Sequence, residues 1–357
     1  MEFVVFAGVL LLLFIFMIVQ ELIQTKNQEK LFKKYLRENY GKEPPKEYSL
    51  ERFARLGSYL ERHKEEKQLD DITWNDLGMD EVFRRIDRTY SAAGEEYLYY
   101  TLRNISCGRE ALEHLEEVVN WLQEQENIKV RIQLLMKRLG HLGKYSLYDY
   151  LDNLDYLGER SNRKIVLGNL LYLPFLLLLF VQPAMGTIGI VLCMLWHIMT
   201  YFREKKVIEP YIISFAYVLR LIDVCEELEK QKIPVYRREL DELREALKSL
   251  RELRRGAYWV MAGNQGKIGG NPLDILADYL RMILHLDIWQ FNLMLRKLRL
   301  KTNEVDRLLG ITGYLDMAIS VGGFRRSLEG YCIPQLEENA NKVYLHMEGG
   351  WHIISRK

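Results

Sequence analysis

The sequence predicts an all-α fold in which an N-terminal transmembrane helix precedes a helical domain that a transmembrane helical hairpin interrupts. Three observations support this prediction. Two long runs carry no Asp, Glu, Lys or Arg, apolar residues elsewhere recur every three to four positions, and no convincing alternating strand pattern separates them. With 357 residues, of which 48% are hydrophobic, the chain is long enough for two ordinary domains.

The first apolar run, Phe3 to Val19, has 17 residues without a charge, about the shortest stretch that spans a bilayer as a helix. A signal peptide would begin with basic residues and end at a small-residue cleavage site, whereas Glu2 precedes this run and Gln20–Gln24 follows it. We therefore interpret residues 1–24 as a retained membrane anchor.

The second run, Ile165 to Phe202, has 38 uncharged residues. As one helix it would extend about 57 Å, whereas a hydrocarbon core is about 30 Å thick. The turn-like stretch Gln182–Gly186 divides the run into Ile165–Val181 and Thr187–Phe202. We predict a transmembrane hairpin at 165–202; the alternative is a buried helical hairpin in a soluble protein.

Basic residues flank the three apolar segments. They are Lys26, Lys30, Lys33 and Lys34 after the first, Arg160, Arg163 and Lys164 before the second, and Arg203, Lys205 and Lys206 after the third. All lie on one side of the membrane if the N-terminus is outside, and the positive-inside rule makes that side the cytoplasm. We therefore expect a multi-pass protein of the cell membrane with its main body, 21–164 and 203–357, in the cytoplasm.

The cytoplasmic parts show helical periodicity. The expected buried faces before the hairpin are Val82, Phe83 and Ile86; Leu98 and Leu102; Leu112, Leu115, Val118, Val119 and Leu122; and Ile132, Leu135, Met136 and Leu139. After the hairpin, a helix is expected from Pro234 to about Gly256, with a buried face of Leu240, Leu243, Leu247, Leu250 and Leu253. A further helix is expected to start at Asn271–Asp274 and to end near Leu298, with a buried face of Ile275, Leu276, Tyr279, Leu280, Ile283 and Leu286. Asn303 is expected to cap a last helix toward Ser320.

Charge and cysteine content exclude several classes of protein. The 50 basic and 49 acidic residues nearly cancel, so no overall field attracts nucleic acid or anionic lipid. The basic residues of 234–256 allow a DNA-facing ridge, but a solvated helix face is the preferred interpretation. The four cysteines, Cys107, Cys193, Cys225 and Cys332, show no paired spacing, which implies neither a disulfide framework nor a zinc site.

No motif predicts a catalytic, cofactor-binding or metal site. The segment Gly263–Gly270 resembles a phosphate loop, but Met261 replaces the first Walker A glycine and Ile268 replaces the magnesium-binding Ser or Thr. The seven histidines, His63, His114, His141, His197, His285, His346 and His352, lack metal-ligand spacing. His197 lies inside an apolar segment, where an ionisable group is a functional suspect, but Trp196 and Tyr201 beside it favour an interfacial position.

Two segments resemble one known family. The first is Ile86–Leu98 followed by Leu102, in which Asp87, Thr89, Ser91, Gly94, Leu98 and Leu102 match the core-domain signature of MutS DNA mismatch-repair proteins, while Glu96 stands where that family usually has an arginine. The second is Gly313–Ser320 with Tyr331–Pro334, which is similar to the MutS segment that closes the lever helices. Thr89 and Ser91 are expected to satisfy backbone groups at a helix break, and Gly94 to allow close helix packing.

The resemblance implies a MutS-like core domain at 70–164, reached through linker helices at 25–69, and a second lever/core part at 203–350. Gly350–Ile353 approaches the motif that precedes the family's ATPase domain, so 351–357 are interpreted as a truncated junction to that domain. ATP and magnesium are expected only for the missing ATPase domain. The implied function is a membrane-anchored module that couples such an ATPase to DNA or a partner, with a homodimer, DNA and a protein partner as candidates.

The alternative is a membrane-bound helical scaffold or adaptor for a protein partner, with no nucleic-acid role and no evident small-molecule substrate. One stretch, Thr73–Phe83, could be taken for an acid/base site because two aspartates flank a tryptophan. We interpret Trp74, Leu77, Met79, Val82 and Phe83 as the entrance to the core domain, capped or solvated by Asp76 and Asp80.

Overall fold

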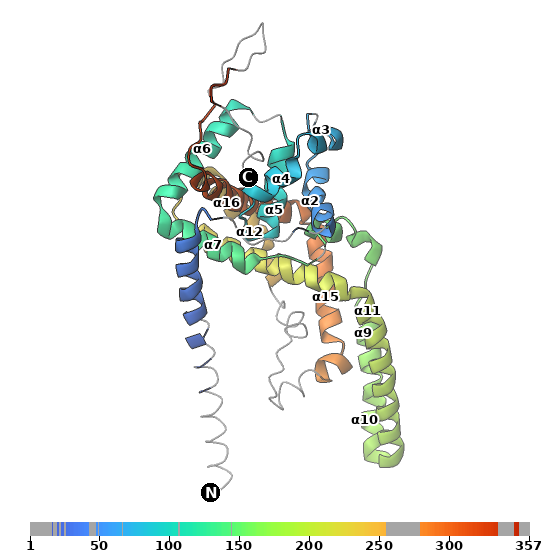
Figure 1. Ribbon diagram of the computed structural model, residues 1–357. Helices are drawn as coiled ribbons and strands as arrows, with labels where there is room; N and C mark the ends of the chain where they lie inside the picture. Colours follow the sequence, from blue (N-terminus) through green and yellow to red (C-terminus); the bar gives the residue numbers. More distant parts are fainter. Residues whose placement is uncertain are drawn as a thin grey trace.

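The computed structural model describes residues 16, 20, 23–24, 26–42, 48, 50–65, 67–105, 108–143, 145–254, 279–334 and 346–349. These residues are mostly helical and contain no strand, only an isolated bridge between Gln68 and Asn104. The all-α prediction is confirmed for this part of the chain. A helical bundle carries two arms that extend from the same side, the helix at 26–39 and a long hairpin (Figure 1).

The helices before the hairpin are α2 (Leu50–Arg62), α3 (Asp71–Asp76), α4 (Met79–Ile86), α5 (Ala92–Arg103), α6 (Arg109–Glu124), α7 (Glu126–Leu139), α8 (Leu147–Leu151) and the 3-10 helix η1 (Leu154–Leu157). The hairpin consists of α9 (Arg163–Leu170), α10 (Tyr172–Val181) and α11 (Pro183–Glu229). After it come η2 (Pro234–Tyr236), α12 (Arg237–Leu250), η3 (Arg251–Arg254), α15 (Leu286–Arg299) and α16 (Thr302–Ser327).

The predicted fold-back is confirmed, and α10 packs along α11. The turn is tighter than predicted, because only Gln182 lies between the two helices and Pro183 already occupies the first turn of α11, where its missing N–H costs no hydrogen bond. Gly189 lets the helices approach, since a Cβ there would lie 2.1 Å from Cδ1 of Phe175.

Two helical stretches, Arg163–Val181 and Pro183–Glu229, are long and apolar enough to cross a membrane. No residue of α10 is fully buried, and Phe180 is 89% exposed, so the side of α10 that faces away from α11 has no partner within the described chain. The predicted N-terminal anchor at 3–19 lies outside the described residues except for Phe16.

Helix α11 does not end near Phe202, where the sequence predicted a boundary, but continues to Glu229. Its last turns are buried in the bundle at Phe215, Leu221 and Cys225. Pro210 lies inside the helix, and α11 changes direction between hairpin and bundle (Figure 1). A proline removes one backbone hydrogen bond and its ring displaces the preceding turn, which explains the bend.

The core is formed mainly by α5, α7, α11, α12 and α16. The leucine stripe of the 234–256 region is buried as predicted, from Leu240 to Leu253, although α12 itself ends at Leu250. Helix α2, which was assigned to a linker, packs against α5 as part of the bundle. Of the faces predicted before the hairpin, Leu112 is the exception, because it is exposed.

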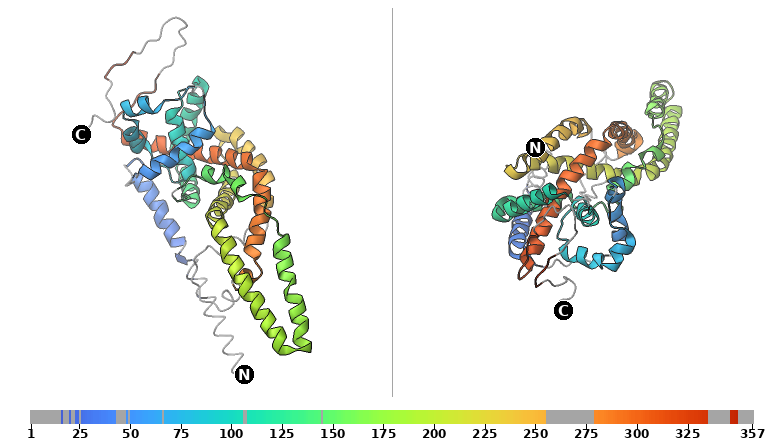
Figure 2. Two further views of the ribbon diagram at one scale, coloured as in Figure 1. Left: turned by 90° about the vertical axis from the view of Figure 1, so that its right-hand side faces the viewer. Right: turned by 90° about the horizontal axis from the view of Figure 1, so that it is seen from above.

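The predicted helix that ends near Leu298 differs from the structure. A left-handed residue, His285 with φ 53°, interrupts it, so α15 begins at Leu286. Tyr279 and Leu280 are exposed rather than buried, because this segment lies beside the hairpin (Figure 2) instead of inside the bundle. Asn303 is not a cap, since α16 already begins at Thr302. The start of the predicted helix, at 271–278, lies outside the described residues.

Candidate functional site: the junction of the two motif segments

The loop between α4 and α5 is shaped by its own polar side chains. Asp87, which is fully buried, accepts hydrogen bonds from the backbone N–H of Thr89 at 2.9 Å and from its hydroxyl at 2.6 Å. A short aspartate that bonds two residues ahead holds the chain in a turn, so α4 stops at Ile86. The Tyr48 hydroxyl also donates to the Asp87 carboxylate.

Ser91 caps the following helix. Its hydroxyl oxygen accepts a hydrogen bond from the N–H of Gly94 at 3.1 Å, which satisfies one of the free donors at the start of α5. The role predicted for Ser91 at a helix break is therefore confirmed, whereas the Thr89 hydroxyl donates to the Asp87 carboxylate instead of a backbone group.

The second motif segment reaches this loop from the other end of the sequence. Asp316 on α16 is fully buried and accepts hydrogen bonds from the N–H groups of Tyr90 at 3.1 Å and Ser91 at 2.8 Å. The Ser91 hydroxyl donates to the same carboxylate at 2.6 Å. Three donors and the positive end of the α5 dipole thus compensate the cost of burying this negative charge.

Two glycines allow α5 and α16 to approach closely. A Cβ on Gly94 would lie 2.4 Å from Oδ2 of Asp316, and a Cβ on Gly313 would lie 2.6 Å from the carbonyl oxygen of Ala93. Atoms cannot approach that closely, so each helix needs a glycine at its contact point. The close packing expected at Gly94 is confirmed.

Ser320, one turn further along α16, binds the other end of the loop. Its hydroxyl donates to the carbonyl of Ile86 at 2.7 Å and accepts from the N–H of Arg88 at 2.7 Å. Asp316 and Ser320 therefore hold both ends of the loop 86–91 on one face of α16. We call this set of contacts the motif junction.

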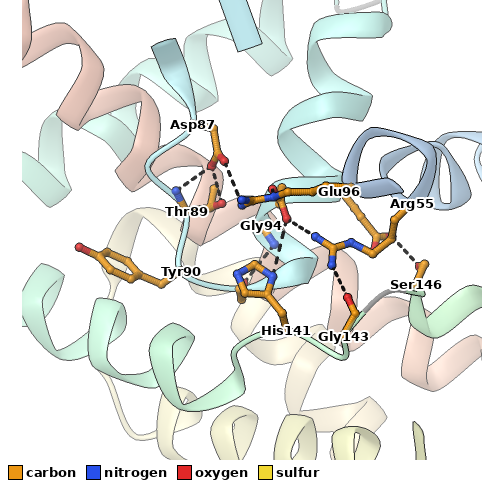
Figure 3. A network of polar contacts seen from close by, with 12 residues as sticks. Arg55, Asp87, Thr89, Tyr90, Gly94, Glu96, His141, Gly143 and Ser146 are labelled. Atoms are coloured by element: carbon orange, nitrogen blue, oxygen red, sulfur yellow. Dashed lines mark hydrogen bonds and ion pairs between the residues drawn. The ribbon is translucent and has the colours of Figure 1, made fainter. Parts of the chain in front are cut away.

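A buried ionic layer lies beside the junction. The Glu95 carboxylate binds Arg52 at 2.5 Å and Arg55 at 2.6 Å, and Arg55 also donates to the carbonyl of Gly143 at 2.7 Å. His141 approaches Glu95 at 3.6 Å. Figure 3 shows Arg55 of α2 beside Glu96 of α5 and beside His141 and Gly143 of the 140–146 loop. Paired and hydrogen-bonded charges of this kind fix one arrangement of the helices rather than provide a free reactive group.

Glu96, which departs from the family signature, is also buried. It accepts a hydrogen bond from the hydroxyl of Ser146 at 2.9 Å, and Ser146 caps α8. Burial away from water raises the pKa of Glu96 to about 8, because desolvation disfavours the charged form. Near neutral pH this buried environment therefore favours the protonated, neutral form of the Glu96 carboxyl.

Trp74 has a structural environment, as predicted. It is 2% exposed, its indole N–H donates to Asp80 at 2.7 Å, and the Arg103 guanidinium lies 4.3 Å from its ring centroid. Asp80 therefore binds the tryptophan rather than capping a helix, and the helix cap is Asp70. Leu77, which was assigned with Trp74 to the entrance of the core domain, is half exposed in the turn that ends α3.

The structure brings most of the predicted motif residues together, but not all. Tyr331, Cys332 and Ile333 lie beyond the end of α16 and are exposed, away from the junction. Arg52, Arg55 and Glu95 were not predicted from the sequence. Arg52 and Arg55 are three residues apart and so share a helix face, but nothing in the sequence identified their distant partner.

Within the described residues no three His, Cys, Asp or Glu side chains converge to hold a metal ion. The glycine-rich segment 263–270 and the 350–353 motif lie outside those residues. In comparisons with known proteins, no family model, curated protein sequence or solved structure matches this chain. What the protein does must therefore be inferred from its own residues and geometry.

Proposed function

We propose that this chain is a membrane-anchored helical module of the MutS-related core-and-lever type, which transmits movement between a membrane hairpin and a cytoplasmic bundle. The observation that carries the proposal is α11, one helix from the hairpin turn at Pro183 to the bundle core at Glu229. Because α11 is helical on both sides of the bend at Pro210, a tilt of the hairpin acts on the helices packed around its buried half, α7, α12 and α16.

The proposed topology has three crossings, at 3–19, 165–181 and 187–202, with the N-terminus outside. The hairpin surface supports its placement in lipid, since Leu177, Phe180 and Met199 are between 69% and 89% exposed and an apolar surface of this extent needs cover. From Pro183 to Phe202, α11 is about 30 Å long, which matches a hydrocarbon core.

The MutS relationship is supported by the motif junction. The two segments that resemble that family are about 230 residues apart in sequence, and they bind each other directly through Asp316 and Ser320. A shared fold would explain why both segments carry these residues. In this proposal an ATPase that binds ATP and magnesium, DNA, and a second copy of the chain are the candidate partners of the bundle.

One observation favours the alternative, a scaffold for a protein partner with no nucleic-acid role. Half of the six basic residues at 237–254 that would form a DNA-facing ridge, Arg238, Arg244 and Arg254, are paired with acids. Arg244 binds Glu229 at 2.8 Å and Arg254 binds Glu226 at 2.7 Å. Arginines that are already paired release fewer counterions on binding phosphate.

Transmission can be tested by changing bilayer thickness. The full-length protein is placed in nanodiscs of short-chain or long-chain lipid, because mismatch with the hydrophobic length tilts transmembrane helices. Hydrogen exchange is then measured in α7 and in α11 beyond Pro210. We expect protection to differ between the two bilayers in both regions. Three glycines inserted after Lys206 should abolish the difference in the bundle, whereas the same insertion after Gly330, outside α16, should not.

Equal protection of the bundle in both bilayers would show that the hairpin does not act on it. The choice between DNA and a protein partner needs a second measurement. Duplex DNA is titrated against the nanodisc-bound protein, and phosphate-mediated binding through six to ten contacts should weaken about 10³-fold or more between about 50 and 200 mM salt. Salt-dependent DNA binding favours the MutS-like role, and its absence favours the scaffold.

A further inference from the structure

A cavity of about 500 Å³ lies where the hairpin meets the bundle. Its walls come from the start of α9, from the 196–207 stretch of α11 and from the 285–292 stretch at the start of α15. In the proposed topology this is the level of the lipid headgroups on the cytoplasmic side. The cavity therefore opens at the boundary between membrane and water.

An apolar groove continues from this cavity along the hairpin. Trp196 lines both the cavity and a second, apolar hollow of about 370 Å³. The lining residues follow helical three- and four-residue steps, so they form one continuous face on each wall. On α11 the steps are Met185, Ile188, Leu192, Trp196, Thr200 and Arg203, and on the facing wall Gly168, Leu171, Phe175 and Leu178.

The mouth of the cavity carries uncompensated positive charge. Arg160 is already paired with Glu204. Lys164 and Arg203 are exposed and have no ion-pair partner among the described residues. Among the described lining residues the acids are Glu204, which binds Arg160, and Glu159, whose side chain is exposed. An anionic group can therefore bind between Lys164 and Arg203 without breaking an existing ion pair.

His197 supplies an acceptor on the cavity floor. This residue is 1% exposed, and its Nδ1 lies 2.7 Å from the carbonyl oxygen of Ile283. Because a carbonyl can only accept, Nδ1 carries the proton, and Nε2 of the neutral ring is an acceptor. Nε2 has no hydrogen-bond partner among the described residues, and it faces Gly168, where a Cβ would lie 3.2 Å away.

Asn292 supplies a second acceptor. Asn162 donates its amide N–H to the carbonyl of Trp289 at 3.2 Å, so its side-chain oxygen faces Asn292 and accepts from it at 2.8 Å. This chain of bonds fixes the orientation of the Asn292 amide. Its oxygen is buried and has no partner among the described residues. Among the described residues these two buried acceptors have no donor, and a ligand that carries donors would satisfy them, because an unsatisfied buried polar atom is costly.

We infer that this cavity binds an anionic phospholipid with a hydroxylated headgroup, an inference that rests on the proposed membrane placement of the hairpin. The phosphate lies between Lys164 and Arg203, headgroup hydroxyls donate to His197 and Asn292, and an acyl chain follows the apolar groove past Trp196. The groove identifies the source of the phosphate as a lipid, since a free phosphate ester would leave it uncovered.

Native mass spectrometry of the full-length protein in detergent tests the charged contacts, with phosphatidylglycerol as the probe. The double variant Lys164→Gln/Arg203→Gln should bind it about 25-fold more weakly, because each basic residue near an anionic headgroup contributes about fivefold. The matched control is Arg163→Gln/Lys206→Gln, which removes the same charge from adjacent positions outside the cavity and should bind nearly as the wild type. Equal losses in both double variants would overturn the inference.

The hydroxyl contacts are tested with a matched pair of lipids. Phosphatidylglycerol and phosphatidylmethanol carry the same charge, but only the first has free hydroxyls. The wild type should prefer phosphatidylglycerol by about fivefold for each hydrogen bond. His197→Leu should reduce that preference. Thermal unfolding of this variant close to that of the wild type shows that it is folded. If His197→Leu fails to fold, Asn292→Leu provides the same comparison. No preference in the wild type would refute the assigned headgroup chemistry.

Further outcomes distinguish a failure of the lipid assignment from a failure of the proposed membrane placement. If glycerol 1-phosphate binds as tightly as the lipid, and the Lys164→Gln/Arg203→Gln variant abolishes both, the ligand is a soluble phosphate ester and the lipid assignment is wrong. If the protein fails to insert into nanodiscs at all, the proposed membrane placement fails and this inference with it. Insertion without any preference for anionic lipid would overturn the inference alone.

Discussion

Replacement of Asp316 tests whether the motif junction holds the bundle together. Asp316→Ala removes the acceptor for the N–H groups of Tyr90 and Ser91 and for the Ser91 hydroxyl, all in a fully buried environment. Each buried donor left without a partner costs about 1–3 kcal/mol, so we expect the free energy of unfolding to fall by about 3–5 kcal/mol. Urea unfolding of the full-length protein in detergent, followed by tryptophan fluorescence, measures this loss.

Two further variants serve as an intermediate case and as a surface control. Asp316→Asn keeps one accepting oxygen but turns an N–H₂ group toward donors, so its loss should be intermediate, about 1–3 kcal/mol. Asp76→Ala removes an aspartate that is exposed at the end of α3, and should change stability by less than about 0.5 kcal/mol. If Asp316→Ala and Asp76→Ala have the same free energy of unfolding, the two motif segments lie side by side without stabilising each other, and the reasoning fails.

Trp74→Ala should destabilise the protein by about 3–5 kcal/mol in the same urea assay, as for other buried aromatic residues; unchanged stability with altered ligand binding would place Trp74 in a site instead. In intact cells, a single cysteine at Ala184 should label from the outside and one at Gln231 should not, and the reverse would refute the proposed topology. Because burial raises the pKa of Glu96 from 4.5 to about 8, the folded protein retains a proton that the unfolded chain releases, so wild-type stability should fall between these pH values. Glu96→Gln should lack this component of the pH dependence, and parallel stability curves for the two proteins would contradict the assignment. Lys267→Ala should leave any magnesium-dependent ATP turnover unchanged, because the surrounding segment lacks Walker A residues; loss of turnover would identify a true phosphate loop.

Sequence patterns predicted those parts of the fold that depend on local chemistry. The leucine stripe of α12 and the fold-back at Gln182 follow from periodicity and from the length of an uncharged run, which neighbouring residues alone determine. Ser91 and Gly94 were also interpreted correctly, because a cap and a close approach have residue-specific requirements.

Features that depend on distant partners were not predictable in this way. Nothing near Arg52 and Arg55 in the sequence points to Glu95, which they bind because α2 packs against α5. The interruption at His285 has no glycine or proline to mark it, and the exposure of Leu280 reflects the neighbouring hairpin rather than its own helix. Phe202 was predicted to end a membrane segment because charged residues follow it. The backbone hydrogen bonding of α11 nevertheless continues through those charged residues.

The order of features along α11 links the proposed lipid cavity to the proposed lever. The cavity takes its α11 wall from 196–207, and Pro210 follows within one turn. Beyond the proline, Phe215 and Leu221 are buried in the core, where α11 packs on α7 and α16. A helix bends most easily where a backbone hydrogen bond is already missing, so a ligand wedged between α9 and α11 acts at the bend. Binding energy that differs between two tilts of the hairpin would therefore shift the equilibrium between them, and α16 would carry that shift to Asp316 and the motif junction.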